Sequence, residues 1–334
     1  MQVLKVLKFG FWLVRTVPEP LLRPLPYAIG VIAFALSGKG RRTIIANQRQ
    51  VLGNASSLRL HWQALRVIVN LLHSYHMLAR LPTMTDEQIR RTVVFEGEAE
   101  IAAALARGRG AIILGAHIAG FNILAPFTAI RSQPAGAFVE PIQPPELFEF
   151  VSQIRARTGL QLFLADREGA VKALRLLRNN GLLLVAADRY LGTNGMHVPF
   201  FGRPAYLSYG PIVLAQRHDA PLLPTTLRRL KDGRFLARVH PPLALVDTGD
   251  RRADLEANMR LLAGALERTV GGAAEQWLIF EPLWDETIDQ AAHEPRAPRP
   301  AVARRWLPRA ALLALLTSRA RPFRRKRPDH PHDS

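Results

Sequence analysis

One histidine in this chain stands where an α/β sheet would present it to a substrate. The apolar run at 111–114 predicts a buried strand, and the segment 115–122 follows it with His117 near its beginning. Open α/β sheets place their chemistry at the carboxyl ends of strands. Imidazole changes its charge near neutral pH, so His117 is a candidate general base for a hydroxyl proton. The alternative is a structural histidine, which is the commoner role of an isolated imidazole.

A second candidate segment lies about seventy residues further on. Asp188 and Arg189 follow the apolar run at 182–185, which also predicts a strand. Arg189 is a candidate contact for an anionic part of a substrate, because a guanidinium binds such groups with two parallel hydrogen bonds. The alternative is a structural ion pair.

Two adjacent aromatic residues mark a third segment. Phe200, Phe201 and Gly202 lie between Pro199 and Pro204, an arrangement that no regular element requires. The rings suit the wall of a channel for an acyl chain, or else a core plug beneath a loop. Gly202 is expected to adopt a backbone angle that other residues resist.

Together these segments resemble the lipid A biosynthesis acyltransferase family. The similarity runs from about residue 25 to residue 286, through 221–224, 276–278 and Trp284. Around 139–159 it is stronger to the branch that includes the phosphatidylinositol mannoside acyltransferases. The resemblance implies a membrane-associated enzyme with a glycerophosphate-acyltransferase-like fold. Such an enzyme moves a fatty acyl chain from acyl-coenzyme A or acyl carrier protein to a glycolipid hydroxyl, without an acyl-enzyme.

Within this resemblance Arg155 becomes a candidate contact for a phosphate or headgroup. It ends the helix predicted over 145–157. The alternative is a solvated arginine that the helix dipole favours at this end.

The family motif, a histidine and an acid separated by four residues, ends here in Asn122. Residues five apart in a straight helix point about 140° away from each other, so a turn at Gly120 would be needed for contact. Asn122 can orient the imidazole of His117 but cannot stabilise the imidazolium by charge. Glu140 and Asp188 are the alternative acids, because both end predicted strands at the same sheet edge. If none serves, the chain is a catalytically impaired homologue that binds lipid or membrane.

The elements that must position these residues follow an α/β pattern. Residues 40–82 are expected to be helical, and short apolar runs then alternate with amphipathic stretches. Strands are predicted at 93–95, 111–114, 135–139, 160–164, 182–185, 222–227 and 235–239. Helices are predicted at 99–106, 122–130, 145–157, 170–177, 207–217 and 253–270. The alternation predicts a mostly parallel central sheet flanked by helices, in one α/β domain at 41–288.

The two ends of the chain differ from this body. Residues 1–40 alternate basic residues with apolar runs, none of which reaches about 20 uninterrupted residues, so they predict an interfacial helical segment rather than a span. A buried helix pair is the alternative. The tail at 289–334 is rich in Pro and Arg and is expected to be disordered, with a short apolar helix at 312–316.

The charge of the chain indicates which kinds of molecule it binds. The net charge of +18 favours an anionic membrane surface. We therefore expect a peripheral or monotopic protein at the cytoplasmic face of the inner membrane. Nucleic acid is not an expected partner, because no recognition motif accompanies the charge.

The sequence also excludes several chemistries. It contains no cysteine, no Gly-x-Ser-x-Gly elbow, no phosphate-binding loop of the Gly-x-x-x-x-Gly-Lys type and no His-Glu-x-x-His helix. His73 and His76 share one helical face with no third ligand in view, so they are expected to be packing residues. No metal or redox cofactor is expected, only the acyl thioester as co-substrate.

Overall fold

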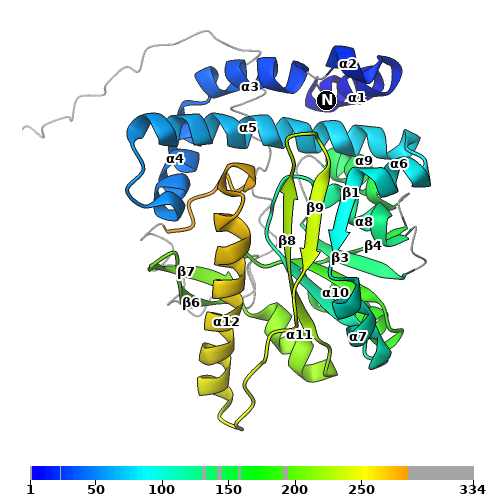
Figure 1. The fold of residues 1–334 in the computed structure, drawn as a ribbon, viewed down its shortest axis with the longest axis vertical. Coiled ribbons are helices and arrows are strands. Elements are labelled where there is room, and N and C mark those ends of the chain that lie inside the picture. Colours follow the sequence, from blue (N-terminus) through cyan, green and yellow to red (C-terminus); the bar gives the residue numbers. More distant parts are fainter. Residues whose placement is uncertain are drawn as a thin grey trace, which may run out of the picture.

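The computed structural model describes residues 2–22, 24–129, 133–140, 145–156, 159–190 and 195–284. A seven-stranded sheet forms its centre, in the order β1-β9-β8-β2-β5-β3-β4, with helices around it (Figure 1). The strands are β1 (Val93–Glu96), β2 (Ala111–Gly115), β3 (Ala135–Val139), β4 (Leu160–Leu164), β5 (Leu182–Ala186), β8 (Leu222–Arg229) and β9 (Phe235–Val239). Neighbouring strands are parallel except β8 and β9, which form an antiparallel pair.

The central strands read as near-continuous apolar runs. β2 is Ala-Ile-Ile-Leu-Gly and β5 is Leu-Leu-Leu-Val-Ala. This composition is typical of parallel strands with both faces covered, where neither face needs polar side chains. The prediction of a mostly parallel sheet flanked by helices is confirmed.

The helices fall into a group around the sheet and a group at the amino terminus. The first group is α6 (Asp86–Thr92), α7 (Glu98–Ala106), α8 (Phe121–Ala129), α9 (Pro145–Ala156), α10 (Arg167–Arg178), α11 (Gly210–His218) and α12 (Arg251–Gly271). The second is α1 (Gln2–Thr16), α2 (Glu19–Leu22), α3 (Leu25–Leu36), α4 (Gly38–Leu52) and α5 (Ser57–Arg80). Short 3₁₀ turns occupy Leu81–Thr83 and Ala274–Gln276.

Helix α5 separates the sheet from a layer made by α1, α2 and α3 (Figure 1). α3 approaches α5 closely at Gly30, where a Cβ atom would lie 2.6 Å from Cγ2 of Val69. The layer leaves large apolar side chains exposed, namely Val6, Phe9, Trp12, Leu21, Tyr27, Val31, Ile32 and Leu36. Within the described residues, one stretch, Glu19–Leu36, is long and apolar enough to cross a membrane by length and composition, with a mean hydropathy of 1.2.

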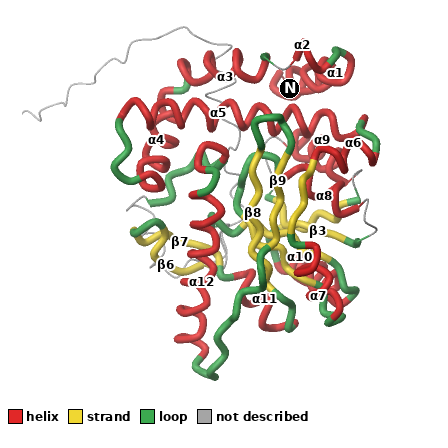
Figure 2. Tube along the Cα trace, in the orientation of Figure 1, coloured by secondary structure: helices red, strands yellow, loops and turns green. Residues whose placement is uncertain are grey.

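A small antiparallel hairpin, β6 (Gly195–Phe200) and β7 (Arg203–Ser208), lies beside α12, apart from the main sheet (Figure 2). The sequence pattern did not predict it. The helix predicted at 207–217 begins at Gly210, because Leu207 and Ser208 pair with β6. The tail at 289–334, with its predicted helix at 312–316, lies outside the described residues, and the domain boundaries at 40 and 288 remain predictions.

Candidate active site

His117 lies in the loop between β2 and α8, at the carboxyl edge of the sheet. The loop ends at Gly120, whose φ of +97° lets the chain turn before α8 begins at Phe121. This is the turn that the sequence required between His117 and the helix. A Cβ atom at Gly120 would lie 2.1 Å from Cε1 of Phe235, so the position also needs glycine for space.

The segment after α12 holds this loop in place. The backbone N–H of Leu278 donates to the carbonyl of His117 at 2.7 Å, and that of Ala119 donates to Gln276 at 2.8 Å. Residues near the end of the described chain therefore fix the backbone around the histidine.

The carboxylate of Asp188 pairs with His117. The His117 Nδ1 to Asp188 Oδ1 distance is 2.6 Å, and the backbone N–H of His117 donates to Oδ2 at 2.9 Å. Trp277 Nε1 also donates to Oδ2, at 2.7 Å. The Asp188 side chain is fully buried, whereas that of His117 is 24% exposed and can meet a substrate.

These contacts decide the ionisation of Asp188. Burial by itself would raise the pKa of Asp188, but the charge and hydrogen bonds of His117, with the hydrogen bond from Trp277, outweigh it and hold the pKa below its usual range. An ionised carboxylate can only accept, so Nδ1 of His117 carries the hydrogen. Nε2 is then the ring nitrogen that can accept a proton.

Strand order explains why Asp188 meets His117 and Glu140 does not. β5, which precedes Asp188, pairs directly with β2. β3, which precedes Glu140, pairs with the far side of β5. Glu140 forms an ion pair with Arg189 instead, and Arg189 Nη1 also lies 3.6 Å from Glu281 Oε1. The Arg189 side chain is 11% exposed and therefore lies inside this ion-pair network.

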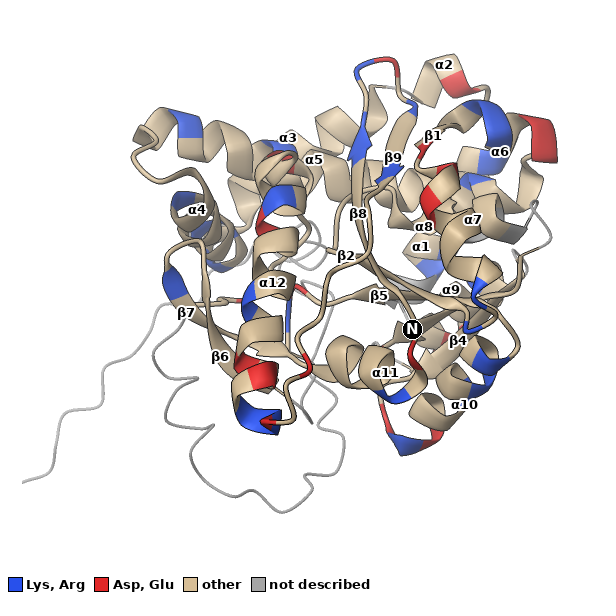
Figure 3. Ribbon diagram, turned by 60° about the horizontal axis from the view of Figure 1, so that its bottom comes forward, with Lys and Arg blue, Asp and Glu red and all other residues tan. Residues whose placement is uncertain are grey.

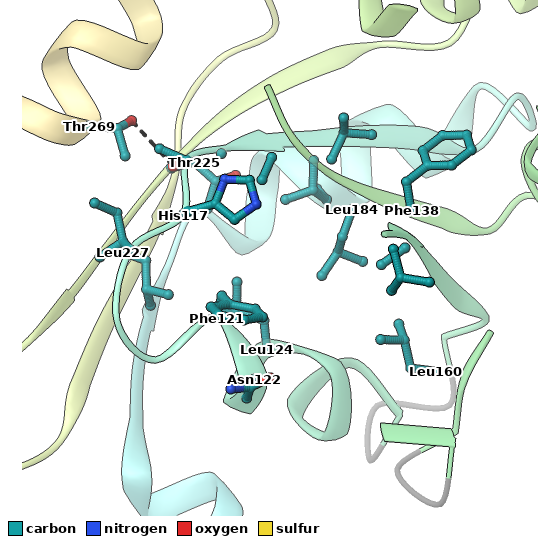
Figure 4. Close-up of a pocket in the computed structure, with 18 of the residues that line it drawn as sticks. His117, Phe121, Asn122, Leu124, Phe138, Leu160, Leu184, Thr225, Leu227 and Thr269 are labelled. Carbon is teal, nitrogen blue, oxygen red and sulfur yellow. Dashed lines mark hydrogen bonds between the residues drawn. The ribbon is translucent and has the colours of Figure 1, made fainter. Parts of the chain in front are cut away.

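An apolar pocket opens beside His117, between the sheet and α8 (Figure 4). Its polar lining residues are His117, Asn122, Arg155, Thr225 and Thr269. Its apolar lining comes from β2, β3, β4, β5, β8 and α8, and includes Ile113, Phe121, Leu124, Phe138, Leu160, Leu184 and Leu227. The arrangement offers an apolar chain a place next to a proton acceptor.

Asn122 lines this pocket but is not bonded to His117. Figure 4 shows the two side chains apart, with Phe121 between them. Asn122 Nδ2 donates to Ser74 Oγ at 3.3 Å, and Arg155 Nε donates to Asn122 Oδ1 at 3.2 Å. The Arg155 guanidinium also lies over the Phe121 ring, 5.3 Å from its centroid. Arg155 is therefore a half-buried pocket residue rather than a solvated helix end.

The Phe200–Phe201–Gly202 segment is the tip of the β6–β7 hairpin and lies outside the pocket lining. Phe201 and Gly202 both have positive φ, +49° and +77°, the pattern of a type I′ turn, and the angle expected of Gly202 is confirmed. Phe200 is fully buried and stacks on Trp284 with 5.8 Å between ring centroids. The geometry matches the core plug, the alternative to a channel wall.

Sequence reasoning missed three residues of this site. Trp277 was noted only as part of the family similarity, and neither Ser74 nor Glu281 carried any local signal. Their contacts join segments more than 40 residues apart, which spacing cannot show. Among the described residues, no three acidic or imidazole side chains cluster as metal ligands would.

Known proteins are similar in sequence to this chain over most of its length. Residues 4–286 match the family described as bacterial lipid A biosynthesis acyltransferase, and the chain belongs to that family. It is 26% identical to the phosphatidylinositol mannoside acyltransferase of Mycobacterium tuberculosis (strain CDC 1551 / Oshkosh), over 82% of this chain and 86% of that protein. Identity to the protein of the same name from Mycolicibacterium smegmatis is 24%, over 82% of this chain and 89% of that protein. The family resemblance seen in the sequence is confirmed, and the matches support an acyltransferase that acts on a glycolipid.

Proposed function

We propose that this protein transfers a fatty acyl chain from an acyl thioester to a hydroxyl group of a phosphatidylinositol mannoside-type glycolipid. The observation that carries the proposal is the His117–Asp188 pair at the edge of an apolar pocket. The names of the relatives supply the acceptor class. Coenzyme A or acyl carrier protein would present the thioester.

In the proposed reaction His117 is the general base. A glycolipid hydroxyl attacks the thioester carbonyl while Nε2 of His117 accepts its proton. The buried Asp188 carboxylate keeps the hydrogen on Nδ1 and stabilises the imidazolium that forms. The imidazolium then returns the proton to the departing thiolate. The acyl group passes directly to the acceptor, in keeping with a chain that has no cysteine.

The pocket would hold the acyl chain of the donor. Its lining is apolar except near His117 and along the Asn122–Arg155 side, so a chain that enters it leaves its carbonyl near Nε2. Arg155 and Asn122 would fix the wall of the pocket through their hydrogen bond and the contact of Asn122 with Ser74. Arg189, with Glu140 and Glu281, would contact the polar acceptor headgroup at the same sheet edge.

The layer of α1, α2 and α3 would place the enzyme on the membrane. It exposes Phe9, Trp12 and Leu21 beside the basic residues Lys5 and Lys8, as an interfacial segment does. We place it at the cytoplasmic face of the inner membrane, where acyl thioesters and anionic lipid would meet. Flotation with anionic vesicles tests this: Phe9→Ser/Trp12→Ser should lower the bound fraction, and unchanged binding would contradict it.

Substitution of the base tests the enzyme proposal. His117→Ala should lower acyl transfer from long-chain acyl-coenzyme A to phosphatidylinositol mannoside by about a thousandfold or more. His61→Ala, an exposed histidine on α5, is the matched control and should leave the rate unchanged. A folded His117→Ala variant that transfers at near the wild-type rate would overturn the proposal.

A further inference from the structure

Arg229, the last residue of β8, lies at the end of the sheet that approaches α5 (Figure 1). Thr225 and Leu227 of β8 line the pocket, and alternation along a strand puts Arg229 on the same face. β8 runs parallel to β2, so Arg229 reaches the same sheet edge as His117. In register it pairs with Phe235, whose ring packs on Gly120. Arg229 is therefore a structural neighbour of the active-site loop.

The backbone of Arg229 is fixed independently of its side chain. Its N–H donates to Gln276 Oε1 at 2.6 Å, and Gln276 Nε2 donates to its carbonyl at 3.1 Å. The adjacent Gln276 carbonyl in turn accepts the N–H of Ala119 in the His117 loop. Gln276 thus holds both the His117 loop and the end of β8. A substitution of the Arg229 side chain removes its charge and leaves these backbone bonds in place.

Two histidines of α5, His73 and His76, lie close enough to Arg229 to feel its charge. His73 and His76 are half-buried and lie one turn apart on the helix. Burial and then the charge of Arg229 lower the pKa of His73 to about 4, and burial, Arg80 and Arg229 lower the pKa of His76, against an opposing effect of Glu19. Both rings are therefore neutral near pH 7, and each can donate one N–H.

None of the described carboxylates pairs with the charge of Arg229. Over the part of the chain that the structure describes, its guanidinium makes no ion pair or hydrogen bond. Asp232 is the acid whose charge acts on it, but the Asp232 carboxylate binds Arg234, at 2.7 Å to Nε and 3.0 Å to the backbone N–H. A half-buried cation without a carboxylate is costly unless an anion binds it.

Further positive charge surrounds the position. Lys231 and Arg234 are exposed around the turn between β8 and β9, and Figure 3 shows Lys and Arg on both strands and on the loop that joins them. Exposed charges of one sign raise the local concentration of an oppositely charged ligand. The half-buried Arg229 would then bind it with two donors in a plane, the geometry that suits a phosphate.

We propose that Arg229, His73 and His76 form a binding site for a phosphate ester beside the acyl-transfer centre. The choice of ligand rests on the proposed function, whose substrates carry phosphate esters in the donor and in the acceptor headgroup. Ser74, next to His73 in the sequence, accepts a hydrogen bond from the pocket residue Asn122, so α5 connects this group to the pocket wall. The site would position one phosphate while the reacting groups meet at His117.

Calorimetric titration with ligands that cannot react tests the site. The probes are coenzyme A against pantetheine, for the donor, and glycerophosphoinositol against inositol, for the acceptor. At least one phosphate probe should bind the wild-type protein more tightly than its phosphate-free counterpart. Arg229→Met should weaken that binding roughly ten- to a hundredfold, the loss expected for a charge-assisted pair. The probe that responds identifies the source of the phosphate.

The matched control is Arg228→Met, because Arg228 is exposed on the opposite face of the same strand. It should change the affinity less than threefold. Arg229→Lys and His73→Gln provide milder variants should Arg229→Met fail to fold, and each should weaken binding severalfold. The proposal is overturned if neither phosphate probe outbinds its counterpart, or if Arg228→Met weakens binding as much as Arg229→Met. No acyl transfer takes place in these titrations, so an inactive protein could still pass them and an active one could still fail.

Discussion

The two sides of the pocket hold their polar groups in different ways. On one side His117 meets a fully buried carboxylate, Asp188, which accepts hydrogen bonds from His117 and from Trp277. On the other side a neutral amide, Asn122, accepts from Arg155 and donates to Ser74. The His117–Asp188 side has the charge and geometry of a general base with its acid. On the Asn122 side the amide binds and orients the Arg155 guanidinium.

The difference shows which neighbours matter to the histidine. Asn122 is close to His117 in the chain, but the turn at Gly120 and the start of α8 direct its amide away. Asp188 is 71 residues away but follows just after β5, the strand that pairs with β2. In the proposed mechanism Asp188 is the acid, so an asparagine at position 122 does not remove it.

Removing the charge of Asp188 should have the largest effect. Asp188→Asn should lower the turnover number by about 10³- to 10⁴-fold, because an amide can stabilise the wrong imidazole tautomer and not the imidazolium. The measurement is steady-state acyl transfer with saturating thioester. Glu140→Gln is the control. The Glu140 carboxylate binds Arg189, which also forms an ion pair with Glu281, so the turnover number should fall by less than about tenfold. Equal losses in the two variants would contradict the difference drawn between them.

Altering the turn that separates the two sides should have the next largest effect. Gly120→Ala forces a Cβ atom into the Phe235 ring at a positive φ and should lower the free energy of unfolding by roughly 2–4 kcal/mol. Chemical denaturation measures this. Gly108→Ala separates the two causes, since Gly108 has a φ of +67° with open space around it, and should cost about 1 kcal/mol. If both variants lose the same stability, the contact with Phe235 does not constrain the turn.

Restoring the family's acid should have the smallest effect. The new carboxylate of Asn122→Asp would face Arg155 and Ser74, so acyl transfer should stay within about tenfold of wild type and should not rise. Asn122→Ala, which removes the acceptor for Arg155, should lower activity further than Asn122→Asp does. A tenfold gain from Asn122→Asp in the same assay would mean that position 122 acts on His117 after all.

The sequence predicted most of the fold because its elements are regular and local. Short, mostly apolar runs marked the strands of the sheet, and glycine marked the turn after His117. The β6–β7 hairpin was missed because each of its strands contains a proline, which argues against a strand, and because aromatic packing on Trp277 and Trp284 holds it.

The sequence predicted the histidine of the site but left two acids, Glu140 and Asp188, as its possible partners. Sequence placed Glu140 and Asp188 at one edge of the sheet, where both indeed lie. Choosing between them required the strand order, in which β5 is inserted between β2 and β3. That order results from packing across the whole domain, and no spacing along the chain reports it. The same holds for Arg229, whose charge acts on His73 and His76 of α5 only in the folded chain.

Nitrogen NMR of the imidazole of His117 tests most directly whether Asp188 is its acid. In wild-type protein near pH 7 the hydrogen should reside on Nδ1, with a proton resonance shifted downfield by the short bond to Asp188. The account predicts that Asp188→Asn removes this resonance or shifts it strongly, while Asn122→Asp leaves it in place. A resonance that survives Asp188→Asn unchanged, or disappears in Asn122→Asp, would contradict it.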